Sequence, residues 1–224
     1  MKTIDPQAPA DRPETEQMKV IHRAMTREFT LLPAQVRRVG EGDSVRASVV
    51  SDHLTLLLGM LHEHHEAEDE LLWPLLHQRV PMENALIEAM EGQHEALDAA
   101  IGTVKSLQLS WTRTAGAAAG EELAVALQQL ADGLAEHLAL EEQKVLPLIH
   151  DHLTVAEWEA PQKHAMKHGP SRLSDKLVLA GIVLEGATPR ERAWFLGGMP
   201  APARVLWRLM GARQYAEHQR LVRA

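Results

Sequence analysis

Two stretches of this chain repeat one pattern of leucine, histidine, glutamate and proline at a constant offset of 73 residues. The first stretch runs from Leu61 to His77 and the second from Leu134 to His150. The matched positions are Leu61, His64, Glu68, Pro74, Leu75 and His77 in the first, and Leu134, His137, Glu141, Pro147, Leu148 and His150 in the second. An internal repeat restricts the fold because both copies must form similar local structure and pack together. We therefore expect two structurally similar halves.

Apolar residues recur at steps of three and four over four long segments, which is the spacing of an amphipathic helix. We expect these helices at about residues 14–39, 45–77, 81–109 and 121–150. The small residues between 112 and 120 are predicted to form a connection. Short connections between long amphipathic helices are typical of an all-α, up-down-up-down four-helix bundle.

The sequence divides into three parts. We predict a tail at residues 1–14, the four-helix bundle at 15–152 and a C-terminal extension at 153–224, where proline and glycine interrupt several short helices. The extension contains Trp194, Phe195 and Trp207, and large aromatic side chains are costly to leave exposed. They are expected to pack against the bundle or against a second chain, so a homodimer formed through the extension is one candidate.

Charge and composition exclude several classes of function. Residues 1–152 carry 25 Asp/Glu and only 12 Lys/Arg, whereas residues 153–224 carry 6 and 11. An acidic body argues against nucleic acid as a partner and suits cation binding. The chain has no cysteine, which excludes thiolate metal sites and iron–sulfur clusters. No apolar run reaches the roughly 20 residues of a membrane span, and the start lacks a signal-peptide core, so we expect a cytoplasmic protein.

Histidine interrupts the apolar stripe of every predicted bundle helix, and glutamate follows one turn later in two of them. Side chains four residues apart lie on one face of a helix, so each His-x3-Glu pair can present a nitrogen and a carboxylate to one point. The spacing from the first to the second histidine is 42 residues, and from the third to the fourth it is 43. These candidate metal ligands are His22, His64, Glu68, His94, His137 and Glu141.

Two explanations of this buried polar set are open. The six side chains could satisfy one another by hydrogen bonds, since unpartnered polar groups are costly to bury. Six residues in two matched sets favour a metal site instead. Because six ligands exceed the four of a closed zinc site, we predict two metal ions, with Glu68 and Glu141 as bridging ligands. Imidazole and carboxylate ligands favour iron over manganese or zinc.

Other polar residues near the motif are predicted not to bind the metal. His62 and Glu66 should face solvent, and His164 and His168 should lie on the surface outside the bundle. Five further residues are candidates for positions beside the ligands, and for one of them, Asp98, a place among the ligands is left open. These five are Asp98, His65, Asp69, Glu142 and Trp73.

The pattern of His22, His64-x3-Glu68, His94 and His137-x3-Glu141 resembles the hemerythrin-like, HHE cation-binding family. The run from His64 to Pro74 is especially similar to bacterial members. The resemblance implies a four-helix bundle with two non-haem iron ions, joined by an oxo or hydroxo bridge, that binds oxygen, peroxide or nitric oxide or senses oxygen or iron. We predict a redox-active, peroxide-decomposing protein, with a non-catalytic sensing or binding module as the alternative.

The chain departs from the oxygen-carrying members of that family. These are expected to have His-x3-His on the third helix, where this chain has Asp98 after His94. They also end with His-x4-Asp, whereas this chain has His137-x3-Glu141. The pattern looks closer to the iron-sensing and di-iron repair branches, although the repair proteins carry an N-terminal cysteine that this chain lacks.

Overall fold

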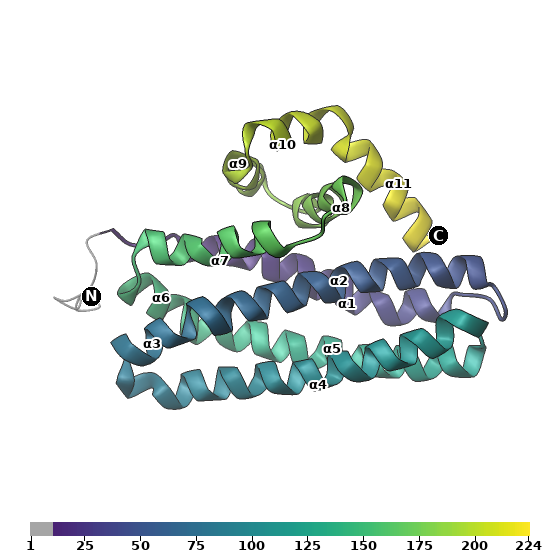
Figure 1. Cartoon of the computed structure of the whole chain (residues 1–224), viewed down its shortest axis with the longest axis horizontal. Helices are drawn as coiled ribbons and strands as arrows, with labels where there is room; N and C mark the ends of the chain where they lie inside the picture. Colours follow the sequence, from purple (N-terminus) through teal and green to yellow (C-terminus); the bar gives the residue numbers. More distant parts are fainter. Residues whose placement is uncertain (1–10) are drawn as a thin grey trace.

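The computed structural model describes residues 11–224, and this part of the chain contains helices and no strand. Four long helices lie side by side, and a smaller group of helices covers one side of them (Figure 1). The long helices are α1 (Met18–Arg37), α2 (Ser44–Leu71), α4 (Asn84–Thr114) and α5 (Ala117–Leu140). The predicted all-helical fold is therefore confirmed.

The long helices pack in a ring, in which α1 and α4 each contact both α2 and α5. Their apolar stripes meet in one core that includes Met25, Phe29, Leu54, Leu97 and Leu130. Side chains at steps of three and four form one face of each helix, and burying that face removes it from water. This packing is that of a helical bundle, while the up-down-up-down order of helix directions stays a prediction.

Two of the predicted helices are interrupted close to their glutamate, the first one four residues after Glu68 and the second one at Glu141. The segment predicted at 45–77 breaks at Leu72, between α2 and α3 (Trp73–Arg79). The segment predicted at 121–150 widens into a π-helical turn at Glu141–Val145, before α6 (Leu146–His152). Pro74 and Pro147 lie in the first turns of α3 and α6, where a residue without a backbone N–H is tolerated. Single π-helical turns often occur at functional sites.

The connection between α4 and α5 is shorter than predicted. The sequence suggested a loop over residues 112–120, but only Ala115 and Gly116 separate the two helices. Alanine is the strongest helix former, which explains why α5 begins within this small-residue stretch. The chain reverses direction at Ala115, whose backbone has a left-handed conformation with a φ of 47°.

A side-chain cap begins α2, whereas 3-10 turns lead into α1 and α4. Asp43 caps α2 by accepting a hydrogen bond from the backbone N–H of Arg46, as its position before the helix predicts. Short 3-10 turns at Thr15–Gln17 and Pro81–Glu83 lead into α1 and α4. Most of the predicted tail at residues 1–14 lies outside the described residues. Arg12, in the part of this tail that the structure describes, forms an ion pair of 3.0 Å with Asp151.

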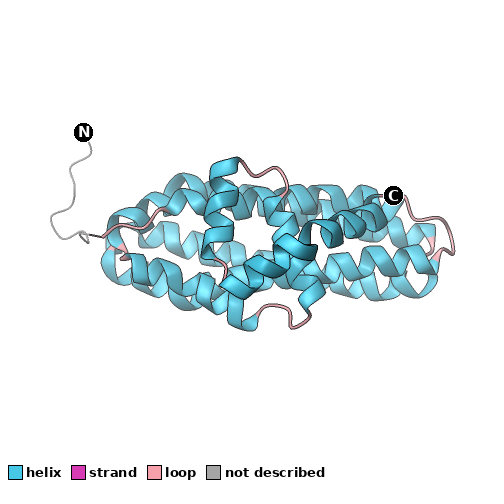
Figure 2. Cartoon of the chain, turned by 90° about the horizontal axis from the view of Figure 1, so that it is seen from above, coloured by secondary structure: helices cyan, strands magenta, loops and turns pink. Residues whose placement is uncertain are grey.

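Residues 153–224 contain short helices that cover one side of the bundle (Figure 2). Helix α7 packs along α2, α8 contacts α1, and α11 contacts both α8 and α2. Thr154 and Thr188 cap α7 and α9 and form reciprocal capping boxes with Glu157 and Glu191. The elements are α7 (Val155–His168), α8 (Leu173–Leu184), α9 (Pro189–Gly198), α10 (Ala201–Leu206), a π-helical turn at Trp207–Gly211 and α11 (Ala212–Arg223).

Apolar packing and one buried charge hold the extension to the bundle. Ile182 and Val183 of α8 belong to the same core cluster as the bundle helices. Glu28 of α1 is fully buried, and its Oε1 contacts Arg27 at 2.8 Å and Arg223 of α11 at 2.9 Å. A buried carboxylate needs such partners, because removing an unpaired charge from water is very costly. The first long helix, α1, and the last helix, α11, therefore share an ion-pair network around this buried carboxylate.

The aromatic residues of the extension are covered to different degrees. Trp207 is buried beside Leu177 and Leu184, in a cluster formed within the extension. Trp194 and Phe195 are half-buried and pack against the main bundle core. Most of this aromatic surface is thus covered within one chain.

Candidate metal centre

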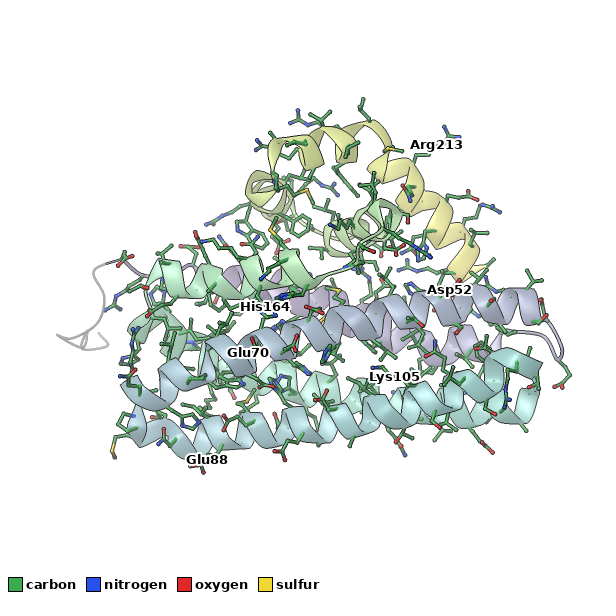
Figure 3. The ribbon with its side chains drawn as sticks, viewed as in Figure 1. Asp52, Glu70, Glu88, Lys105, His164 and Arg213 are labelled. Atoms are coloured by element: carbon green, nitrogen blue, oxygen red, sulfur yellow. The ribbon has the colours of Figure 1, made fainter. Side chains whose placement is uncertain are left out.

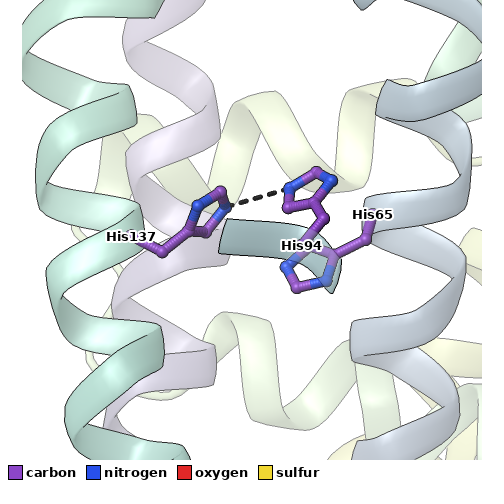
Figure 4. Close-up of side chains that lie close together, drawn as sticks. All are labelled: His65, His94 and His137. Atoms are coloured by element: carbon purple, nitrogen blue, oxygen red, sulfur yellow. Dashed lines mark hydrogen bonds between the residues drawn. The ribbon is translucent and has the colours of Figure 1, made fainter. Parts of the chain in front are cut away.

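The bundle core contains two neighbouring clusters of metal-binding side chains. His65, His94 and His137 form one, in which the potential ligand atoms lie within 4.8 Å of one another. These histidines come from α2, α4 and α5, and Figure 4 shows them converging. All three are buried, with at most 3% of each exposed. Three neutral imidazoles directed at one point are a donor set that divalent transition metals bind well.

The second cluster combines two histidines with two carboxylates. His22, His64, Glu68 and Glu141 bring their ligand atoms within 4.8 Å of one another. His22 comes from α1, His64 and Glu68 from α2, and Glu141 from the π-helical turn after α5. Both glutamates have no exposed surface. Such a mixture of imidazole and carboxylate suits iron, manganese or zinc.

Glu68 lies between the two clusters. Its Oε1 is 3.4 Å from His64 Nε2, and its Oε2 is 3.6 Å from His94 Nε2. The Oε2 of Glu141, the other carboxylate of the second cluster, is 3.3 Å from His22 Nε2. One carboxylate therefore directs its two oxygens to different histidine groups, as a ligand shared between two cations would.

Hydrogen bonds orient two of the rings so that their free nitrogens face each other. His94 Nδ1 donates to Asp69 Oδ1 at 2.6 Å, and His137 Nδ1 donates to Gln93 Oε1 at 3.1 Å. With a proton on each Nδ1, each Nε2 carries a lone pair, and the two Nε2 atoms are 3.2 Å apart. A cation bound by both nitrogens would remove the repulsion between these lone pairs.

Many polar atoms of the two clusters are buried without a hydrogen-bond partner. This is the observation that decides between a self-satisfied polar layer and a metal site, because buried polar groups are normally hydrogen-bonded. The unpartnered atoms are His22 Nε2, His64 Nε2, both ring nitrogens of His65, and both carboxylate oxygens of Glu68 and Glu141. A metal ion satisfies such atoms directly, so the residues fit a bound cation better than they fit one another.

The electrostatics of the site favour an added positive charge. Burial raises the pKa of Glu68, and the nearby Glu141 raises it further. Burial also raises the pKa of Glu141. Burial and the neighbouring histidines lower the pKa of His137 to about 3, and the same causes lower the pKa of His64 and of His65. His64, His65 and His137 are thus neutral near pH 7, which is the form that binds metals.

Three residues that we predicted beside the ligands do contact them. Asp69 accepts hydrogen bonds from His94 Nδ1 and from Trp73 Nε1, the latter at 2.8 Å. The ring of Trp73 is fully buried and lies 5.7 Å from that of His94. Glu142 accepts a hydrogen bond of 3.1 Å from His22 Nδ1. Carboxylates that hold the far nitrogen of a histidine orient the ring and strengthen it as a ligand.

The position of Asp98 corrects one of our predictions. Asp98 is exposed on α4, so it is neither among the ligands nor beside them. The buried face of α4 runs through His94, Leu97 and Ile101, and this stripe leaves Asp98 on the solvent side. Asp98 therefore does not take the place of the histidine that oxygen-carrying members have at this position.

His65 is more deeply buried than we predicted, since we expected its side chain to lie beside the ligands or in solvent. Only 2% of the residue is exposed, and its ring stacks on that of His94 at 4.1 Å. His65 thus adds a fifth imidazole to the set of four that the motif supplied. A sequence signal existed, because His65 follows Leu61 by four residues and a step of four continues a helical stripe. His62 is exposed, as predicted.

The fold and the site together define a helical bundle protein with a cation-binding centre in its core. The model of the hemerythrin HHE cation-binding domain family matches residues 14–149. The chain belongs to this family, which confirms the resemblance found in the motif. Neither a curated protein nor a solved structure matches the chain significantly. Within residues 11–224, no helix is both long and apolar enough to cross a membrane.

Proposed function

We propose that this protein holds two iron ions and decomposes peroxide, as a cytoplasmic defence against oxidative stress. The observation that carries the proposal is the place of Glu68, whose two oxygens face two different groups of histidines. One group, His65, His94 and His137, would hold the first ion. The other, His22, His64 and Glu141, would hold the second, with Glu68 shared between them.

A pair of bound iron ions would supply the two-electron exchange that peroxide decomposition needs, in which one hydrogen peroxide is reduced to two waters and a second is oxidised to oxygen and two protons. The histidine-rich ligand set favours iron over manganese. Oxygen, hydrogen peroxide and nitric oxide are the small ligands that we propose for this centre.

The protein itself supplies two hydrogen-bonded connections between the centre and solvent. His94 Nδ1 contacts Asp69, whose side chain is 43% exposed, and His22 Nδ1 contacts Glu142, which is 32% exposed. A carboxylate at the surface can accept or return a proton at the ring nitrogen that it contacts. The buried ring of Trp73 lies 5.7 Å from that of His94 and would limit the entry of water on this side. These contacts suit a centre whose reaction needs protons but little bulk water.

The test is peroxide turnover by the iron-loaded protein, together with its metal content. We expect two irons per chain and consumption of hydrogen peroxide that depends on iron. A Glu68→Ala variant should lose both properties. One zinc and no iron per chain after loading in iron medium would refute the di-iron proposal, and two irons without peroxide consumption would refute the enzymatic part alone.

A sensing or binding role without catalysis is the second candidate. It is favoured by the contacts of α1, which carries His22 to the centre and also binds the extension. Arg27 donates to the backbone carbonyl of Ile182 at 2.7 Å, and Arg23 forms an ion pair of 2.9 Å with Glu191. A shift of α1 on binding a ligand would therefore reach the extension.

Hydrogen exchange separates the two candidates. A sensor should show altered protection of α8 and α9 when oxygen or nitric oxide is added, without peroxide turnover.

The extension also leaves Val205, Leu209 and Met210 exposed, which supports our proposal of a homodimer through this region. Sedimentation of the wild type and of a Leu209→Glu variant tests that dimer, which the charge should dissociate.

A further inference from the structure

A third cluster of metal-binding side chains lies outside the bundle core, between α7 and α2. His164 and His168 are one helical turn apart on α7, and Glu63 faces them from α2. Their ligand atoms lie within 4.8 Å of one another. Figure 3 labels His164 on α7 and Glu70 on the neighbouring α2. Our prediction that His164 is a simple surface residue is therefore wrong, since α7 packs against α2 and leaves only 13% of that side chain exposed.

Two further carboxylates of α2 face the same histidine. Glu66 Oε2 is 3.6 Å from His164 Nε2, and Glu70 Oε2 is 3.8 Å from His164 Nδ1. Neither distance is short enough for a good hydrogen bond. Residues 63, 66 and 70 follow steps of three and four, so they form one stripe on the outer face of α2. This stripe is distinct from the inward one that carries Glu68.

Two atoms of the cluster are buried without a hydrogen-bond partner. They are Glu63 Oε2 and His164 Nε2. A buried carboxylate oxygen without a donor is unusual and costly, because it has lost its water and gained no partner. The two histidine rings approach each other edge to face, with centroids 4.2 Å apart. Donor atoms of both kinds thus converge without satisfying one another.

The cluster can be reached from solvent. A hollow of about 490 Å³ lies between α2, the residues after α7, and α11, and both Glu63 and His168 line it. His168 itself is exposed. A metal ion could enter here without passing through the bundle core, and an entry path is one requirement of a real metal site.

We propose that Glu63, His164 and His168 bind a divalent transition-metal ion of the zinc class. Two imidazoles at i and i+4 on a helix plus one carboxylate are a common three-ligand set for zinc, and Glu66 or water would supply a fourth ligand. Imidazole donors disfavour calcium and magnesium, which prefer oxygen ligands. Because its ligands come from both helices, the ion would hold α7 of the extension against α2, the helix that carries three of the candidate ligands in the core.

The experiment is a zinc titration of the full-length, iron-loaded protein by calorimetry, with metal analysis after gel filtration. Wild type should bind one more zinc per chain than the His164→Ala/His168→Ala double variant, while both keep the same iron content. Glu63→Gln, which preserves size, should weaken zinc binding by more than the roughly 10- to 100-fold that loss of a supporting contact causes. His62→Ala is the matched control, because it removes an exposed imidazole from the same stretch of α2.

Cobalt provides a spectroscopic readout that does not depend on folding stability. Bound Co²⁺ should give the intense visible absorption of a four-coordinate ion in wild type and His62→Ala, but not in the double variant or Glu63→Gln. Zinc should also slow amide exchange in α7 of wild type only. The proposal is overturned if wild type takes up no additional zinc, if the double variant binds zinc as well as wild type, or if zinc enters only by displacing iron.

Discussion

His94 Nε2 and His137 Nε2 lie 3.2 Å apart in the bundle core, and the Nδ1 atom of each ring meets its own acceptor. Neither ring can donate from Nε2 while its proton stays on Nδ1. The pair is therefore held in the form that a metal ion requires, by contacts made before any ion arrives. Asp69 and Gln93 are as much a part of this arrangement as the two histidines.

Replacing Glu68 by alanine should remove most of the bound iron. Glu68 is fully buried and faces both histidine groups, so its loss takes one ligand from each proposed ion. Glu66→Ala is the matched control, because Glu66 lies two residues away on the outer face and contacts His164 instead. Iron per chain, measured after gel filtration, should fall toward zero in the first variant and stay unchanged in the second. Equal losses would mean that the wrong face of α2 has been assigned.

Replacing His65 by glutamine should reduce the iron content from two toward one. The three-histidine group would keep only two of its imidazoles, whereas the group with the two glutamates would stay complete. His62→Gln removes an exposed imidazole three residues earlier on α2 and should have no effect. Two firmly bound irons in the His65 variant would show that this residue only packs beside the centre.

Asp69→Asn should weaken metal binding by about 10- to 100-fold without abolishing it, since Asp69 orients a ligand rather than being one. The asparagine can still accept a hydrogen bond from His94, but its negative charge is gone. Asp98→Asn on α4 is the control and should leave affinity unchanged, because Asp98 is exposed. Competition with a chelator measures the metal affinity of both variants. A larger effect of Asp98 than of Asp69 would contradict the positions described here.

Arg223→Ala should destabilise the whole chain by about 1–3 kcal/mol, the usual cost of leaving a buried charge short of a partner. Glu28 is fully buried, and Arg223 is one of the two arginines that contact it. Arg220→Ala removes an exposed ion pair with Glu217 three residues away in the same helix, and should change stability much less. Urea unfolding, followed by circular dichroism, compares the free energies of unfolding of the two variants. Similar losses would indicate that α11 contributes through helix propensity alone.

The contact of the extension with the bundle should weaken in mild acid. Burial, and then the neighbouring His53, lower the pKa of His218 to about 4, below its ordinary value of about 6.5. The folded state then binds fewer protons than the unfolded state between these values, so stability is lost as pH falls from about 6.5 to 4. The charged groups that act on His218 are Glu28, Asp175 and Arg223.

His218→Gln should flatten this part of the pH dependence, since glutamine does not titrate. The difference in unfolding free energy between wild type and variant, measured at several pH values from 7.5 to 4, isolates the effect from that of the core histidines. A constant difference over this range would show that His218 does not titrate as its burial requires.

The repeat and its spacing were sufficient to predict the helical fold and the choice of His22, His94, His137 and Glu141 as buried core residues. These predictions depend on local periodicity, because a step of three or four residues along a helix returns to the same face. The same periodicity predicted that Glu68 faces inward.

Only the tertiary structure showed that His65 faces the core together with His64, since both are compatible with the stripe that begins at Leu61. Steps of three and four are equally allowed, and the inward face of a bundle helix is broad enough to accept both rings. The exclusion of Asp98 has the same cause, because the neighbouring helices determine which edge of a stripe is covered.

The cluster of Glu63, His164 and His168 could not be predicted from the sequence either. Glu63 lies about 100 residues from the two histidines along the chain, and nothing in the local pattern of α7 indicates which bundle helix it packs against. Local spacing determines which side chains share a helix face, but the packing of the extension on α2 determines which faces meet. The sequence by itself thus determined the helices and most of the core centre, and the packing between distant segments decided the fifth histidine and the outer cluster.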